Sequence, residues 1–103
     1  MEIVNLTPHT INETTTEQSF EPSGTVARLY QKSEVTDTIN NIPMYTTIIG
    51  DVVGLPEPKE GVMYLVSSMC LTGVKNRDDV IAPGNLVRDE NGQPIGCQGF
   101  RTK

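Results

Sequence analysis

The stretch Val62-Met63-Tyr64-Leu65-Val66, followed by Ser67-Ser68-Met69-Cys70-Leu71, is the most apolar in the chain and decides its fold. A short continuous run of apolar, partly β-branched and aromatic residues is typical of a strand that is buried on both faces. We therefore expect residues 62–66 at the centre of a sheet. The two serines are favoured helix caps, and they predict one short helix over roughly residues 68–75, which Gly73 weakens.

The composition of the whole chain favours strands. It contains only two alanines, against ten valines, eight isoleucines and twelve threonines, and β-branched side chains lose entropy in helices. Nine glycines and seven prolines are spread along all 103 residues and punctuate them with turns. We expect a single domain over residues 1–103 that is mainly β, small-barrel or sandwich-like, with about six to eight short strands and one short helix.

Local signals place further strands and turns. Residues 46–53 indicate a strand with a bulge at Gly50, and Asn91-Gly92 is the strongest hairpin dipeptide of the chain. Residues 13–18 predict a hairpin loop or an exposed edge, and residues 76–84 predict a loop closed by Pro83-Gly84. The polar residues 31–41 follow no clear pattern. The expected core residues are Val26, Leu29, Ile48, Val52, Tyr64, Val66, Leu71, Val80 and Ile95.

Charge excludes several classes of partner. With 13 acidic and 8 basic residues, the chain has a formal net charge of −5. Nucleic acids and anionic membranes are bound through basic faces, so we expect no DNA, RNA or membrane partner. No apolar run approaches the ~18 residues of a membrane span, and no secretory signal begins the chain, so we expect a cytoplasmic location. Basic residues concentrate in the last third, which allows a local pocket for a small anion.

Residues of the kinds that build catalytic or metal centres are scarce. Cys70 and Cys97 are the only cysteines and His9 is the only histidine, so we expect no metal site and no cofactor. Phosphate-loop, dinucleotide and hydrolase motifs are absent from the sequence. We expect a protein that is not an enzyme and that keeps both thiols reduced and packed. A small nucleotide hydrolase is the less favoured alternative, because a lone histidine leaves little catalytic machinery.

Serine turns beside arginines predict a binding site for a small anion. Two serines open the predicted helix directly after a central strand, where free backbone N–H groups attract negative charge. One arginine follows a Pro-Ser-Gly turn and another follows the predicted helix, and a guanidinium can form a bidentate pair with phosphate or carboxylate. The ligand-binding candidates are Arg28, Ser67, Ser68 and Arg77, followed by His9 and Ser23.

Each of these candidates also has a purely structural interpretation. Ser67 and Ser68 can act only as helix caps, and Arg77 can pair with Asp79 to stiffen its own loop. His9 follows a rigid Thr-Pro turn and can bond to nearby backbone. The charges of the segment around Asn91-Gly92 are those of any exposed hairpin tip.

Several segments of the chain, taken in order, carry a resemblance. They are Asn5-Leu6-Thr7-Pro8-His9-Thr10-Ile11, Pro22-Ser23-Gly24-Thr25-Val26-Ala27-Arg28, Gly54-Leu55-Pro56-Glu57-Pro58, Tyr64-Leu65-Val66-Ser67-Ser68, Arg77-Asp78-Asp79-Val80 with Ala82-Pro83-Gly84, and Val87-Arg88-Asp89-Glu90-Asn91-Gly92 with Ile95-Gly96-Cys97. In this order they resemble a family of small uncharacterised proteins of bacteriophages, prophages and bacterial mobile elements. The resemblance covers nearly the whole chain except residues 31–41. It implies little biochemistry, because the family carries no assigned enzyme activity and no assigned catalytic residues, so no site residue follows from it.

The resemblance sets the context for a functional hypothesis. Phage accessory proteins of this size often act against host defence, and some sequester nucleotide-derived signals without transforming them. We expect a protein of the host cytoplasm that binds and sequesters a small anionic, nucleotide-like ligand. Two alternatives stay open: an acidic inhibitor that binds another protein by mimicking nucleic acid, and a small structural protein of the virion.

The size of the chain also bears on assembly. A domain of about 100 residues with a thin apolar complement is marginally stable alone, and short strands leave open sheet edges. Proteins often cover such edges with a second copy of themselves. We therefore expect a homo-oligomer, with the anion site near a subunit interface and Arg28 or Arg77 facing it.

Overall fold

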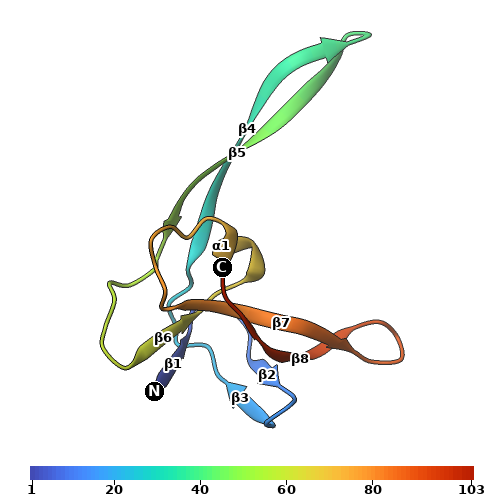
Figure 1. Ribbon diagram of the computed structural model, residues 1–103. Helices are drawn as coiled ribbons and strands as arrows, with labels where there is room; N and C mark the ends of the chain where they lie inside the picture. Colours follow the sequence, from blue (N-terminus) through green and yellow to red (C-terminus); the bar gives the residue numbers. More distant parts are fainter.

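The structure, a computed structural model, describes residues 1–103 as a six-stranded sheet, a two-stranded ribbon and one short helix (Figure 1). The elements are β1 (Glu2–Asn5), β2 (Ile11–Glu13), β3 (Gln18–Phe20), β4 (Arg28–Ile39), β5 (Ile42–Val53), β6 (Val62–Leu65), α1 (Ser68–Thr72), β7 (Val80–Arg88) and β8 (Pro94–Arg101). Strands hold 54% of the residues and helix 5%, which confirms the mainly β fold with one short helix.

The six-stranded sheet forms a nearly closed barrel, here called the body. Its strand order is β1-β6-β7-β8-β2-β3. β1, β6 and β7 run parallel, β7 and β8 form an antiparallel hairpin, and β2 pairs parallel to β8 and antiparallel to β3. After β3 the chain returns to β1 through a parallel bridge between Asn5 and Pro22. The first and last strands of the sheet are thereby brought together.

The apolar stretch that follows Gly61 forms β6, which is an interior strand as expected but stands second in the sheet, next to the end strand β1, rather than at its centre. β6 lies between β1 and β7, and its apolar run is buried because parallel neighbours flank it on both sides. Ser67 caps α1, and its hydroxyl oxygen accepts a hydrogen bond of 3.1 Å from the Cys70 amide. The helix ends earlier than predicted because Gly73 is its C-cap. No helix of the structure combines the length and the apolar character needed to cross a membrane.

The expected core residues divide into three groups. Four are buried and pack with Leu6, Ala27, Val62, Cys70, Val74 and Ala82: they are Tyr64, Val66, Leu71 and Val80. Three are half-buried, namely Val26, Leu29 and Val52. The prediction was wrong for Ile48 and Ile95, which are 42% and 52% exposed. Ile48 lies on the two-stranded ribbon of β4 and β5, and Ile95 lies next to the turn of the β7–β8 hairpin.

The turn predicted at Pro83-Gly84 was also wrong, because both residues lie inside β7. β7 pairs with β6 only over its first residues, so Pro83 lies beyond the end of β6. The missing N–H of Pro83 therefore removes no hydrogen bond between β7 and β6. The backbone of β8 passes so close to Gly84 that a side chain does not fit there, since a Cβ would lie 2.7 Å from the carbonyl oxygen of Gly99. The hairpin predicted at Asn91-Gly92 is confirmed and joins β7 to β8.

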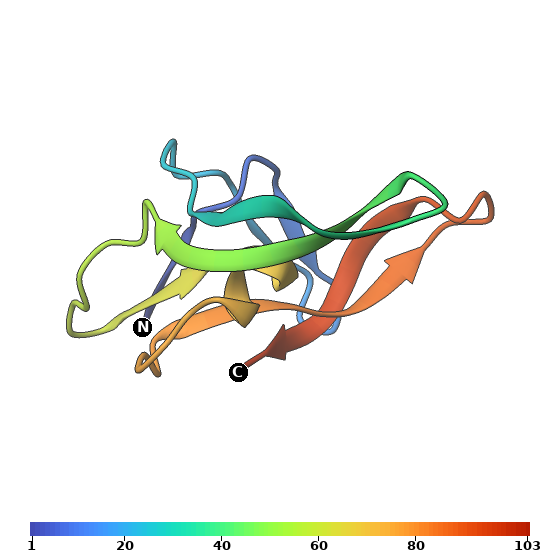
Figure 2. The same ribbon diagram turned by 90° about the horizontal axis from the view of Figure 1, so that it is seen from above.

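β4 and β5 form a two-stranded ribbon, here called the arm, that projects away from the body (Figure 1) and overlaps it in the view from above (Figure 2). The residues without a clear pattern, 31–41, therefore complete a long hairpin. Its two-residue turn is Asn40-Asn41, with φ of 52° and 65°, which asparagine tolerates better than most residues. The bulge predicted at Gly50 is confirmed, because Gly50 and Asp51 together oppose Tyr30 alone.

The loop between β2 and β3 confirms the hairpin predicted over residues 13–18 and hides a carboxylate. Glu13 is only 5% exposed. Its oxygens accept hydrogen bonds from the backbone amides and hydroxyls of Thr15 and Thr16 and from the Gly99 amide, at 2.6–3.0 Å. These donors, led by the Thr16 hydroxyl, hold the pKa of Glu13 far below its ordinary 4.5. The network ties the hairpin loop to β8.

We predict that Glu13 makes stability depend on pH. Because folding lowers the pKa of Glu13, its stabilising effect is fully present above about pH 4.5 and is lost as the pH falls. Glu13→Gln should lower Tm at pH 7 by at least ~5 °C, and the difference from wild type should narrow between about pH 5 and pH 2. Thermal unfolding across this range measures both. The control is Glu17→Gln, at an exposed position of the turn that follows β2, and parallel profiles for wild type and Glu13→Gln would contradict the prediction.

Candidate functional site

The turn after β1 is built around a buried amide side chain. Asn5 is 2% exposed, and its Oδ1 accepts hydrogen bonds from the backbone amide of Thr7 at 2.9 Å and from the Thr7 hydroxyl at 2.7 Å. Its Nδ2 donates to the carbonyl oxygens of His9 and Phe20, both at 2.8 Å. This is an Asx-turn extended by two further bonds. It holds Thr7 and Pro8 against the body.

Three segments meet beside this turn and enclose a cleft of about 320 Å³, here called the Arg28 cleft. They are the turn after β1, the base of β4 and the start of α1. The lining residues are Leu6, Thr7, Pro8, Val26, Ala27, Arg28, Leu29, Gln31, Ser67, Met69 and Cys70. The volume is at the lower end of the range of ~300–1,000 Å³ that small-molecule sites occupy.

The Arg28 cleft is cationic in an acidic protein. None of the chain's 13 carboxylates lines it. Arg28 is exposed and takes part in neither of the two ion pairs nor in any side-chain hydrogen bond of the structure. Burial raises the pKa of the Cys70 thiol, which keeps it neutral. The guanidinium is thus the only charged group of the cleft.

The other polar groups of the cleft can donate hydrogen bonds. The Ser67 oxygen accepts from the Cys70 amide, which leaves its own proton to donate, and the Gln31 side-chain amide carries two more donors. Apolar side chains, among them Leu29 and the 60% exposed Met69, form the rest of the wall. The arrangement suits a ligand with an anionic group and a flat apolar part.

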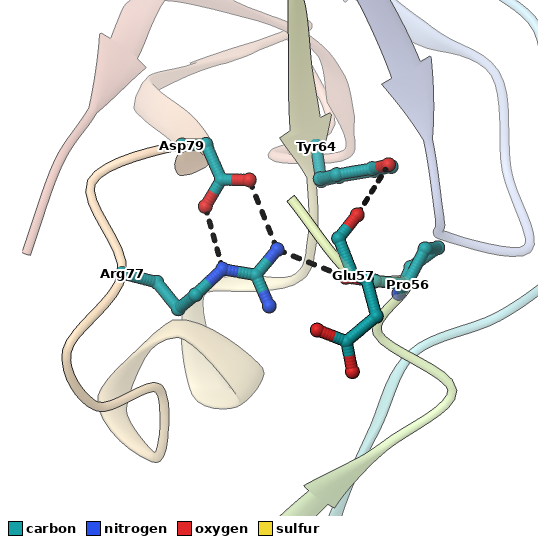
Figure 3. Close-up of polar contacts among 5 residues, drawn as sticks. All are labelled: Pro56, Glu57, Tyr64, Arg77 and Asp79. Carbon is teal, nitrogen blue, oxygen red and sulfur yellow. Dashed lines mark hydrogen bonds and ion pairs between the residues drawn. The ribbon is translucent and has the colours of Figure 1, made fainter. Parts of the chain in front are cut away.

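Arg77 does not line the Arg28 cleft, and its guanidinium already has hydrogen-bond partners. Its Nε and one Nη donate to the two carboxylate oxygens of Asp79 at 2.7 and 2.9 Å, and that Nη also donates to the Pro56 carbonyl at 2.9 Å (Figure 3). The hydrogen bonds with Asp79 raise the pKa of Arg77 and lower that of Asp79. Since the Tyr64 hydroxyl donates to the Glu57 carbonyl at 3.2 Å, the two contacts together fasten the loop after β5 to the body. Arg77 thus pairs with Asp79 and stiffens its own loop, as the structural interpretation of this residue expects.

The remaining candidates are spread over the surface. His9 lines a separate groove between the turn after β1 and the β7–β8 hairpin, and only its backbone groups take part in hydrogen bonds. Ser23 contacts the backbone of Thr25 in a local turn. Ser68 is the exposed first residue of α1 and does not line the Arg28 cleft. Of the six candidates, the structure brings together Arg28 and Ser67.

Sequence reasoning missed most of the residues that line the cleft, among them Thr7, Pro8 and Gln31. Thr7 and Pro8 lie in the turn after β1, and their place beside β4 follows from the long-range bond between the Ala27 amide and the Leu6 carbonyl, 2.9 Å long. Gln31 begins the stretch without a clear pattern. No local signal brings these residues to Ser67, because the sheet topology does so.

Comparisons with known proteins add no assignment. No family model, no curated protein and no solved structure matches the chain.

We predict that Arg77 stabilises the fold. Arg77→Ala leaves the carboxylate of Asp79, whose side chain is 13% exposed, without its partner, and should lower the free energy of unfolding by about 1–3 kcal/mol. Urea denaturation followed by circular dichroism measures the change. Arg101→Ala, at an exposed position with no side-chain hydrogen bond, is the matched control and should change stability by less than ~0.5 kcal/mol. Equal stability of the two variants would contradict the role given to the Arg77–Asp79 pair.

Proposed function

We propose that the chain is a non-enzymatic binding protein that sequesters a small anionic, nucleotide-like ligand in the Arg28 cleft. The observation that carries the proposal is an arginine without a carboxylate partner, in a cleft without acidic residues, in a chain of net charge −5. An isolated guanidinium in a concave site is available for a phosphate or carboxylate. Ser67 and Gln31 supply further donors, and the apolar wall offers a surface for a base or ribose.

The cleft favours binding over reaction. Its polar side chains are mainly donors, and neither a carboxylate nor an imidazole that could take up a proton lines it. Its single cation gives an affinity that depends on salt and on the negative charge of the ligand. The resemblance to phage and prophage proteins supports a setting in the host cytoplasm, where the ligand would be a nucleotide-derived signal of the host.

We predict that Arg28 dominates the affinity. Isothermal titration calorimetry against a panel of cyclic dinucleotides and ADP-ribose isomers should identify a ligand, and that ligand should be recovered intact after the protein is denatured. Arg28→Ala should raise Kd by roughly 10- to 100-fold, because a hydrogen bond to a charged group contributes about 1.5–3 kcal/mol.

Two variants serve as controls for this measurement. Arg101→Ala removes an exposed arginine outside the cleft and should leave Kd unchanged. Arg77→Ala should lower stability without changing Kd at a temperature where the protein is folded, because that guanidinium is already paired with Asp79. Absence of binding across the panel, or unchanged binding by Arg28→Ala, would refute the proposal, and a chemically altered ligand would refute its non-enzymatic part.

A further inference from the structure

The arm exposes more apolar surface than a monomer usually does. Nine of its large apolar residues are between 42% and 66% exposed: Tyr30, Val35, Ile39, Ile42, Met44, Tyr45, Ile48, Ile49 and Val53. Single exposed apolar residues are normal on a monomer, whereas apolar residues gathered on one exposed element are typical of a surface that contacts another chain.

The apolar residues lie on both faces of the ribbon. Because side chains alternate along a strand, Met44 and Ile48 of β5 point to one face, and Tyr45 and Ile49 point to the other. The body covers only the base of the arm, where Leu29 and Val52 approach Gly73. A two-stranded ribbon without cover on either face is marginally stable in water. The rest of the arm therefore needs a partner.

The two edges of the arm differ in protection. β4 and β5 pair only with each other, so the outer edge of each strand has unpaired backbone groups. β4 carries Lys32, Glu34 and Asp37, and charged side chains are the usual protection of an edge strand. β5 has no charged residue over residues 42–50. Pro43, which lacks a donor, interrupts this edge only near the tip.

We propose that two copies of the chain dimerise through their arms, with β5 of one copy pairing antiparallel to β5 of the other. When a strand pairs antiparallel with a copy of itself, a two-fold axis relates the two strands. The same edge of β5 can therefore supply both sides of the interface. The product is a four-stranded sheet in the order β4-β5-β5-β4 with the uncharged edges inside and the charged strands outside. We place the axis within residues 44–48, away from Pro43 and from the bulge at Gly50.

Cysteine cross-linking tests the pairing. Five variants, each with one cysteine introduced at residues 44–48, are oxidised at micromolar concentration. One or two neighbouring positions should form a disulfide-linked dimer, because facing residues at the axis lie about 4.5–5.5 Å apart. The native thiols, Cys70 and Cys97, are 1% exposed and should not react. Glu34→Cys is the matched control, since Glu34 is the β4 partner of Thr46 and would lie on an outer strand of the new sheet, away from its copy.

A pair of lysine variants distinguishes edge pairing from packing of faces. Thr47 and Ser33 are register partners on the same face of the arm. Thr47→Lys places like charges across the two-fold axis and should raise the dimer Kd, measured by sedimentation equilibrium, by more than ~10-fold, whereas Ser33→Lys should not. Circular dichroism confirms that both variants are folded.

The possible results separate cleanly. A dimer that cross-links through β5 and is weakened only by Thr47→Lys supports the proposal. A mass of 11.3 kDa at all micromolar concentrations, cross-linking no faster than that of Glu34→Cys, or equal weakening by both lysines would each overturn it. So would a dimer that neither arm variant affects.

Discussion

The side-chain amide of Asn5 is the contact on which the closure of the body depends. It stands at the end of β1, bonds to the turn that follows and reaches the last residue of β3 at Phe20. The two strands at the ends of the six-stranded sheet meet there, and an unsatisfied amide in that buried position would be costly. The same bonds set the place of Thr7 and Pro8 in the Arg28 cleft. Closure of the barrel and shape of the cleft thus share one side chain.

Much of the fold could be predicted from local signals. The apolar run of β6, the cap at Ser67 and the turn at Asn91-Gly92 each act through neighbouring residues, so a single sequence displays them. The arm escaped prediction in its β4 half because a ribbon exposed on both faces has no alternation of buried and exposed residues. Ile48 was placed in the core for the same reason, since an apolar side chain does not indicate whether anything covers it.

The candidate site was less accessible to prediction. The helix cap indicated Ser67, and the Pro-Ser-Gly turn indicated Arg28. These two residues meet because Leu6 contacts Ala27, and no residue spacing in the sequence predicts that contact. Arg77 illustrates the opposite case, because its partner Asp79 lies two residues away and is visible in the sequence. Local pairs can be inferred from one chain, whereas a cleft formed by three distant segments cannot.

The position of the arm in the chain also bears on how the body folds. β1 has β6 as its only ladder partner, with Glu2 opposite Val62, so it must wait for most of the chain to be synthesised. The arm lies between them and has a two-residue turn, and hairpins form in roughly 1–10 μs. Even a transient arm holds Arg28 next to Val53 and so shortens the loop that β1 and β6 must close. During synthesis, a formed arm shortens the flexible chain between β1 and β6 and so lowers the entropic cost of pairing these two strands.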